Sequence, residues 1–253
     1  MTVTPLIDYA NLLDVLEVEG ERLATSATGS DPESEVPYLA GMRLGEVVRH
    51  VGSVYRMVVS WLHDGERPTR WQRAPADGQP LIDYLRAGLL EVVHELAQHD
   101  PLDGCPTWWP EHQNYGFWCR RLAHETTVHR HDVQMSGAAA MVGGIPPQIA
   151  LDGVDEVLTL WFTHRLSVLG VYDARPGRVA IHTGGRRWIA QITPTGTSAW
   201  KADADEQVDA IVSSDPAGMY LWLWGRRPGA HVMEAGDPEA VAQLQDLLRM
   251  ATR

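Results

Sequence analysis

The sequence has few of the residues that stabilise secreted or membrane proteins. Its two cysteines, Cys105 and Cys119, are too few for a disulfide framework and are not spaced as in a zinc ribbon. No apolar run approaches the roughly 18 residues that cross a bilayer, and the segment from Met1 to Asp8 lacks the basic and apolar parts of an export signal. We therefore expect a cytoplasmic protein with free thiols, no export signal and no membrane span.

Positive charge is also scarce. Lysine and arginine together number 21 against 33 aspartates and glutamates, the net charge is -12, and no basic cluster interrupts this acidic excess. Binding to a nucleic acid or to an anionic membrane depends on clustered basic side chains, so we expect neither partner. A small anionic substrate would need a local cationic pocket. The length of 253 residues suits one large domain or two modest ones.

The first half of the chain has the apolar periodicity of long helices. The pattern is clearest over residues 43–63, where valine and leucine recur on one face for several turns. Stretches rich in polar residues, proline and glycine separate the helical segments. Four long helices joined by loops favour an up-down four-helix bundle. The predicted helices cover residues 4–23, 43–63, 80–100 and 113–135.

The pattern changes after residues 136–147, a stretch rich in glycine and proline that is typical of a linker. A helix at 148–168 follows, and short runs of β-prone residues then indicate a small α+β unit. The predicted strands cover residues 178–183, 188–193, 207–213 and 231–234, and the predicted helices cover 215–224 and 237–251. We therefore predict a four-helix bundle at residues 1–144 and an α+β domain at residues 145–253.

The fourth predicted helix carries polar residues on the face that should be buried. Spacings of four, three, four and four residues place five side chains on one stripe: Trp118, Leu122, Glu125, His129 and Val133. An unsatisfied carboxylate or imidazole in a core costs roughly several kcal/mol. A divalent metal held by Glu125 and His129 would satisfy both. If this pair lay at the surface instead, Trp118 and Leu122 would be exposed with it.

A third ligand must come from another helix, and His50 is the candidate because it lies on the flank of the apolar face of residues 43–63. Zinc accepts histidine and glutamate, and three protein ligands leave its fourth position open to a thiolate, water or a substrate oxygen. Asp132 is placed to accept the second ring N–H of a ligating histidine; alternatively, it is a solvated charge. His124 and His131 lie off the stripe, and we expect them at the surface or at the rim of the site.

The sequence contains the segments LGEVVRHV at 44–51, RRLAHETTVHRHD at 120–132, DGVDE at 152–156 and LWLWGR at 221–226. Together they resemble the mycothiol-dependent maleylpyruvate isomerase family. The resemblance implies a DinB-like metal-binding four-helix bundle followed by a sterol-carrier-like α+β domain. It implies His50, Glu125 and His129 as zinc ligands, and an arginine of the second domain in the active site. Arg226 is the best match for that arginine, and its neighbour Arg227 is the alternative.

The resemblance also implies a chemistry. A metal lowers the pKa of a bound thiol such as mycothiol from about 8.5 to below neutral. The thiolate adds to an electron-poor double bond; rotation and loss of the thiol give cis-trans isomerisation, whereas release of the adduct gives S-transfer. Arg226 would neutralise a substrate carboxylate or a developing enolate. We therefore expect Zn²⁺ or another divalent metal, mycothiol as cosubstrate, and a small electrophilic substrate.

Two other functions fit the same residues. One is a metal-dependent hydrolase, with zinc-bound water as nucleophile and Asp132 or a neighbouring histidine as base. The other is not an enzyme: the metal would stabilise the bundle, while the second domain binds an apolar ligand. Protein donors in all four coordination positions would favour this last function. The sequence identifies neither the acceptor substrate nor the oligomeric state.

Overall fold

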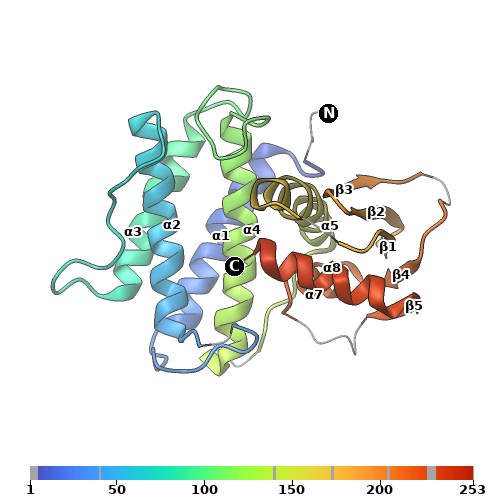
Figure 1. Cartoon of the computed structure of the whole chain (residues 1–253). Helices are drawn as coiled ribbons and strands as arrows, with labels where there is room; N and C mark the ends of the chain where they lie inside the picture. The colour runs from blue at the N-terminus through green and yellow to red at the C-terminus, as the bar shows by residue number, and fades with distance from the viewer. Residues whose placement is uncertain are drawn as a thin grey trace. The chain divides into compact units, whose positions relative to one another are not determined.

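The computed structural model describes residues 5–39, 41–138, 141–171, 174–203, 206–226 and 232–252. The chain divides into two compact units, at residues 1–143 and 144–253 (Figure 1). Within the described ranges, no helix combines the length and the hydrophobicity needed to span a bilayer.

The first unit is a helical bundle, as the sequence predicts. Figure 1 shows its helices running side by side, and the most extensive contacts join α1 to α4 and α2 to α3. Leucine, valine and aromatic side chains from all of these helices fill the core. The bundle helices are α1 (Tyr9–Ala27), α2 (Leu44–Asp64), α3 (Leu81–Ala97) and α4 (Tyr115–Val133).

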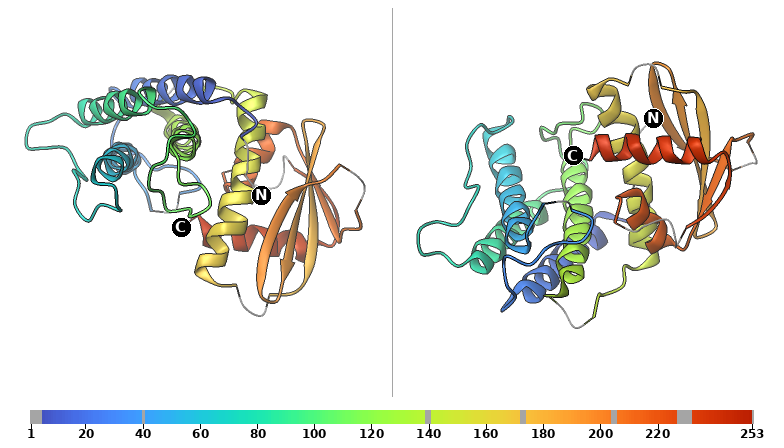
Figure 2. Two further views of the ribbon diagram at one scale, coloured as in Figure 1. Left: turned by 90° about the horizontal axis from the view of Figure 1, so that it is seen from above. Right: turned by 60° about the horizontal axis from the view of Figure 1, so that its bottom comes forward.

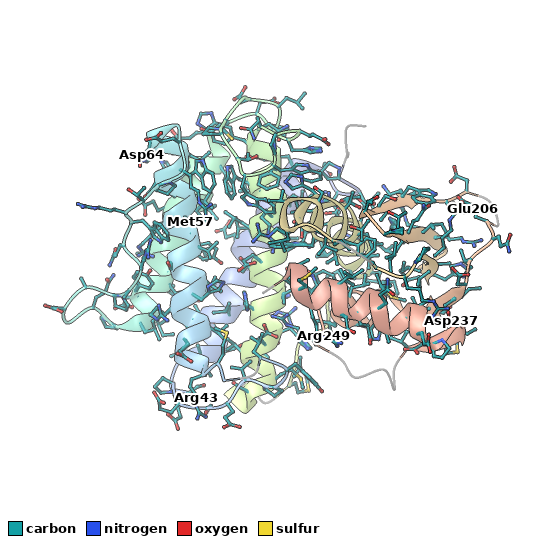
Figure 3. The ribbon with its side chains drawn as sticks, in the orientation of Figure 1. Arg43, Met57, Asp64, Glu206, Asp237 and Arg249 are labelled. Carbon is teal, nitrogen blue, oxygen red and sulfur yellow. The ribbon has the colours of Figure 1, made fainter. Side chains whose placement is uncertain are left out.

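Capping residues determine where the bundle helices begin and end. α1 begins at Tyr9 rather than near residue 4, because the Asp8 side chain accepts a hydrogen bond from the N–H of Asn11 and caps the helix. α2 ends at Asp64, one residue after its predicted end, and the next residue, Gly65, has a φ of 71°. Glycine adopts this left-handed conformation without a steric penalty. Figure 3 labels Asp64 at this end of α2.

Helix α4 is the most buried helix of the bundle. Every residue of it except Gly116 and Glu125 is buried, although many of its side chains are polar. The hydroxyl groups of Tyr55 on α2 and Thr126 on α4 share a buried hydrogen bond of 2.7 Å, which holds the two helices together. α4 continues into a short π-helix, η1 (Gln134–Ala138), in which Gly137 has a φ of 86°.

The second unit combines a five-stranded sheet with helices, which confirms the predicted α+β class. The strand order is β3-β2-β1-β4-β5; β1 and β4 are parallel, and the other neighbours are antiparallel. The strands are β1 (Gly177–Thr183), β2 (Arg186–Thr193), β3 (Gly196–Lys201), β4 (Ala210–Ser213) and β5 (Met233–Gly236). The helices are α5 (Pro147–Glu156), η2 (Val157–Arg165), α6 (Leu166–Leu169), α7 (Pro216–Leu223) and α8 (Pro238–Ala251).

Some elements of this unit differ from the prediction. The helix predicted at 148–168 is one continuous run of α5, η2 and α6, of which η2 is π-helical. The strand predicted at 231–234 runs over Met233–Gly236 instead, and His231 lies outside the described residues. Strand β3 escapes prediction because its sequence, GTSAWK, lacks the alternation of apolar and polar residues that marks a half-buried strand. In the structure none of its residues is fully buried.

Helices cover one face of the sheet. Trp188 of β2 donates a hydrogen bond from Nε1 to Asp155 Oδ1 on α5 (2.9 Å), and the Thr197 hydroxyl of β3 donates to the carbonyl oxygen of Phe162 on η2 (2.5 Å). Figure 2 shows this helical run and α8 on the same side of the sheet. Because successive side chains of a strand point to opposite faces, Ile189, Gln191 and Thr193 of β2 point away from α5, to the face opposite that of Trp188.

Gly153 of α5 lies against the ring of Tyr220 on α7. A Cβ at position 153 would lie 2.2 Å from Tyr220 Cε2, and Tyr220 is fully buried. We expect Gly153→Ala to lower the free energy of unfolding by about 1–3 kcal/mol in urea denaturation, because the ring must shift. Gly196→Ala is the control, since a Cβ there meets nothing within 4 Å. Equal losses in the two variants would contradict this account.

Candidate metal centre

Three polar side chains, those of His50, Glu125 and His129, form a cluster between α2 and α4. His50 Nε2 lies 3.0 Å from Glu125 Oε1, and His129 Nε2 lies 3.2 Å from the same oxygen. One ligand atom from each residue lies within 4.8 Å of the other two, and among the described residues no other group of histidine, cysteine, aspartate and glutamate does so. The structure therefore brings together the three residues predicted as metal ligands. Metal binding by them stays a prediction.

The packing of α2 on α4 explains why these side chains meet. Glu125 and His129 are one helical turn apart, and so they lie on one face of α4. The buried hydrogen bond between Tyr55 and Thr126 holds α2 against α4. Because Thr126 follows Glu125 directly, this contact lies next to the cluster. His50 precedes Tyr55 on α2 and contacts α4 from there, with its imidazole ring 5.1 Å from that of His129 between centroids.

The cluster is most exposed on the side of His50. The His50 side chain is 44% exposed, whereas those of Glu125 and His129 are 15% and 11% exposed. If the three residues bind a metal, two nearly buried donors and one accessible donor fit a site that admits a small molecule, as catalytic metal sites do.

Two further side chains orient Glu125 and His129, the two predicted ligands of α4. Asp132, which is 1% exposed, places Oδ2 3.0 Å from His129 Nδ1, which is the first of the two positions considered for it from the sequence, and this leaves Nε2 facing Glu125. Arg121 donates from Nη2 to Glu125 Oε2 (2.8 Å), so Oε1 remains for the two histidines. Arg121 was not among the predicted site residues, although its spacing of four residues from Glu125 is the same signal that selected His129.

Charge within the cluster shifts two pKa values in opposite directions. Burial opposes the charged form of Glu125, but the two histidines and Arg121 outweigh it and hold the Glu125 pKa well below its ordinary value. Burial likewise opposes charge on His129, yet Glu125 and Asp132 raise the His129 pKa to about 9. The stability that protonated His129 contributes is fully present below its ordinary pKa of 6.5 and is lost as the pH rises through about 9.

A metal that bound to His129 would therefore have to replace a proton on this residue. We expect the binding of Zn²⁺ near pH 7 to release about one proton per ion, and the apparent affinity to rise about tenfold per pH unit until it levels off near pH 9. Titration calorimetry in two buffers of different ionisation enthalpy measures the proton release. An affinity that does not change between about pH 7 and pH 9 would contradict the raised pKa.

The positions predicted for His124 and His131 are wrong. The sequence places both at the surface or at the rim of the site, but they are 0% and 5% exposed. The prediction assumes a single buried stripe, whereas α4 is buried around nearly its whole circumference. Neither histidine belongs to the group of ligand atoms described above.

Arg226, the predicted active-site arginine, follows α7 in the second unit. It is 8% exposed, and its Nη1 donates to the carbonyl oxygen of Trp224 (2.8 Å), with the guanidinium carbon 5.8 Å from the centre of the Trp224 ring. Arg227 lies outside the described residues. The role of Arg226 in an active site stays a prediction.

Two family profiles match the chain. The mycothiol maleylpyruvate isomerase N-terminal domain matches residues 13–134, and the MDMPI C-terminal domain matches residues 148–243. No curated protein matches the sequence. Among solved structures, the crystal structure of the mycothiol-dependent maleylpyruvate isomerase is similar, with a TM-score of 0.64 and 14% identity over 93% of this chain and 97% of that chain. A mutant of that enzyme gives the same values.

At this identity the likeness between the structures establishes the fold, and the profiles establish the family. The two matched domains follow one another in this chain, and they correspond to the helical and the sheet-containing unit respectively. The chain therefore belongs to the mycothiol-dependent maleylpyruvate isomerase family.

Proposed function

We propose that this protein is a metal-dependent enzyme that uses mycothiol to convert a small electrophilic substrate from its cis to its trans isomer. The observation that carries the proposal is the convergence of His50, Glu125 and His129 in the helical unit. Family membership supports mycothiol as the thiol. S-transfer to the substrate is the alternative outcome of the same chemistry.

The donor set fits a zinc ion. Two neutral imidazoles and one carboxylate leave a net single positive charge on a divalent metal, which favours an anionic fourth ligand such as a thiolate. The Asp132 carboxylate holds the His129 ring in the orientation that a ligand needs, and such partners of ligating histidines affect metal affinity strongly. Arg121 engages the other oxygen of Glu125 and keeps that carboxylate in place.

The chemistry follows from these groups. A divalent metal bound here would lower the pKa of a thiol from about 8.5 to below neutral. Glu125 remains ionised at neutral pH because its pKa is held well below the ordinary value. The thiol sulfur forms a bond to one carbon of the substrate double bond, and the electron pair moves to the conjugated carbonyl. Rotation about the new single bond and loss of the thiol give the trans product.

We assign the substrate carboxylate, or the enolate that develops from it, to Arg226. Arg226→Ala is expected to retain the metal and to lower kcat/KM at least about tenfold, because a charged hydrogen-bond donor is lost. Elemental analysis and steady-state kinetics measure the two quantities. Arg186→Ala, at an exposed position of β2, is the control. Loss of the metal from Arg226→Ala would show that this residue supports the metal site rather than the substrate.

The competing functions have less support. A hydrolase needs a base that is free to accept a proton, whereas Asp132 is 1% exposed and is hydrogen-bonded to His129. A purely structural metal is normally enclosed by protein donors. The 44% exposure of the His50 side chain does not fit such an enclosed site.

Titration of mycothiol into zinc-loaded protein tests the proposal. We expect saturable heat with the loaded protein and none after chelation, and turnover of a cis-configured unsaturated keto acid only when the thiol is present. Turnover without thiol would favour the hydrolase. A metal-dependent rise in melting temperature without thiol binding would favour the structural metal. A released thiol adduct in place of the trans isomer would identify S-transfer.

A further inference from the structure

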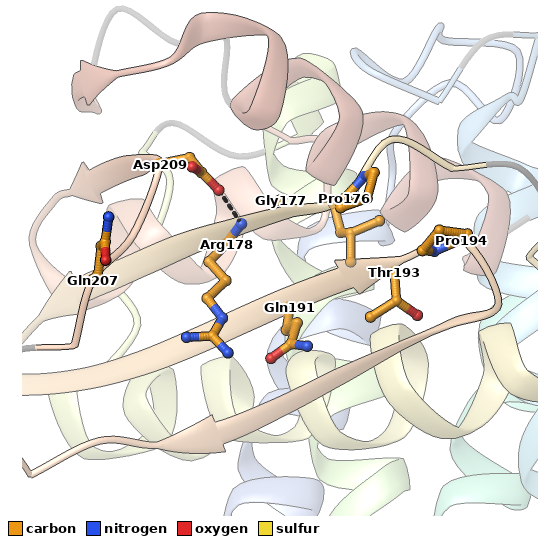
Figure 4. A pocket seen from close by; sticks show the side chains of 9 residues that line it. Pro176, Gly177, Arg178, Gln191, Thr193, Pro194, Gln207 and Asp209 are labelled. Atoms are coloured by element: carbon orange, nitrogen blue, oxygen red, sulfur yellow. Dashed lines mark hydrogen bonds between the residues drawn. The ribbon is translucent and has the colours of Figure 1, made fainter.

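A second candidate site lies on the sheet of the second unit. A pocket of about 400 Å³ opens there, lined by the start of β1, the end of β2, the turn after β2 and the segment before β4 (Figure 4). This volume lies within the range of small-molecule sites, roughly 300–1,000 Å³. All of its lining residues belong to the second unit, so the site does not depend on the candidate metal centre.

The polar side chains of the pocket face away from the helix layer. Arg178 stands directly opposite Gln191 in the antiparallel pairing of β1 with β2. Trp188 points toward α5, because it bonds to Asp155 there. Gln191 is three residues further along β2 and therefore points to the opposite face, together with Arg178. Figure 4 shows the guanidinium of Arg178 and the amide of Gln191 extending from adjacent strands in the same direction.

Arg178 offers a cation that the described part of the protein does not neutralise. Its side chain is half-buried, and among the described residues neither its guanidinium nor the half-buried amide of Gln191 has a hydrogen-bond or ion-pair partner. Asp209 lies nearby, but its Oδ2 accepts from the backbone N–H of Arg178 (2.7 Å) rather than from the guanidinium (Figure 4). In a chain with a net charge of -12, this leaves a local positive group available to an anion.

We propose that this pocket binds the carboxylate of a small organic acid. The parallel N–H groups of the Arg178 guanidinium match the two oxygens of a carboxylate, and the Gln191 amide adds a neutral donor from the next strand. Asp209 lines the same pocket and would repel a doubly charged phosphate, whereas a single carboxylate carries less charge to be repelled. Pro176 and Pro194 give the pocket apolar walls, so the acid has an apolar body.

A chemical-shift titration of the full-length ¹⁵N-labelled protein with hexanoate tests this site. We expect saturable shifts of the Gln191 side-chain amide, with a dissociation constant on the order of 1 mM or lower. Hexanamide, which has the same chain without the charge, should bind at least about tenfold more weakly. Inorganic phosphate should not displace hexanoate.

Variants locate the binding to individual side chains. Arg178→Gln should weaken hexanoate binding at least about tenfold, and Gln191→Met should weaken it by a smaller factor of about three. Arg186→Gln removes the same charge from an exposed position on β2 and should leave the affinity unchanged. Thermal midpoints within a few degrees of the parent establish that each variant is folded.

Three results would overturn the proposal. They are the absence of saturable shifts, equal weakening by Arg178→Gln and Arg186→Gln, and displacement of hexanoate by phosphate at similar concentrations. If Arg178→Gln does not fold, the comparison of hexanoate with hexanamide and the Gln191→Met variant decide the question.

Discussion

Glu125→Ala is expected to bind zinc at least about 100-fold more weakly than the parent protein and to lose the thiol-dependent activity with it. Alanine removes one of three donors that lie within 4.8 Å of one another. It also removes the carboxylate that Arg121 and His129 both contact, so two cationic groups are left without their shared partner. Elemental analysis after dialysis and competition with a chelating indicator measure the loss.

Two further variants make this result specific. Asp132→Asn keeps the shape of the residue that contacts His129, and we expect it to weaken zinc binding by about 10- to 100-fold, as changes beside metal ligands do. Glu91→Ala, at an exposed position of α3, should have no effect. If Glu125→Ala binds zinc as tightly as the parent, the metal site is not at these residues.

Glu19→Ala is expected to lower the free energy of unfolding by about 3–5 kcal/mol, the cost of breaking a buried ion pair by removing one partner. Glu19 Oε2 accepts from Arg130 Nε at 2.6 Å, and their side chains are 5% and 0% exposed. Arg130 also donates to Gln134 and to the carbonyl oxygen of Gly143, which hold the cation in the core once the carboxylate is gone. Urea denaturation measures the change.

The controls separate charge from packing. Glu17→Ala changes an exposed residue of the same helix and should alter stability by less than about 0.5 kcal/mol. The double variant Glu19→Leu with Arg130→Met removes both charges, and it should recover much of the loss because an apolar pair can replace a buried ion pair. A double variant as unstable as Glu19→Ala would show that shape, rather than charge, determines the cost.

The convergence of His50, Glu125 and His129 could be predicted because its signals are local. Glu125 and His129 interrupt an apolar stripe at helical spacing, and His50 lies on the flank of the strongest helix pattern in the chain. Arg121 carries the same spacing but escaped prediction, because a basic residue on a helix is usually solvated. His124 was misplaced for a different reason: how many sides of a helix are covered depends on tertiary packing, which periodicity within the helix does not reveal.

The pocket on the sheet was not predicted from the sequence. It depends on the register between strands, which places residues of different strands opposite one another. The register nevertheless has a sequence signal in the two-residue turn Gly184–Gly185, where both residues have positive φ values of 55° and 72°. Such a turn fixes the pairing of β1 with β2, and with it the placement of Arg178 opposite Gln191. Strand β3 was missed because its sequence, GTSAWK, lacks a regular alternation of apolar and polar residues.

His50 and Glu125 are separated by 75 positions along the chain, yet their side chains touch. An ion held by both would act as a removable cross-link between α2 and α4, binding the folded chain and not the unfolded one. Each tenfold rise in free metal above the dissociation constant would then add about 1.4 kcal/mol to the stability of the fold. The supply of metal in the cell would thereby affect how long the protein survives proteolysis, even at concentrations that already saturate the site.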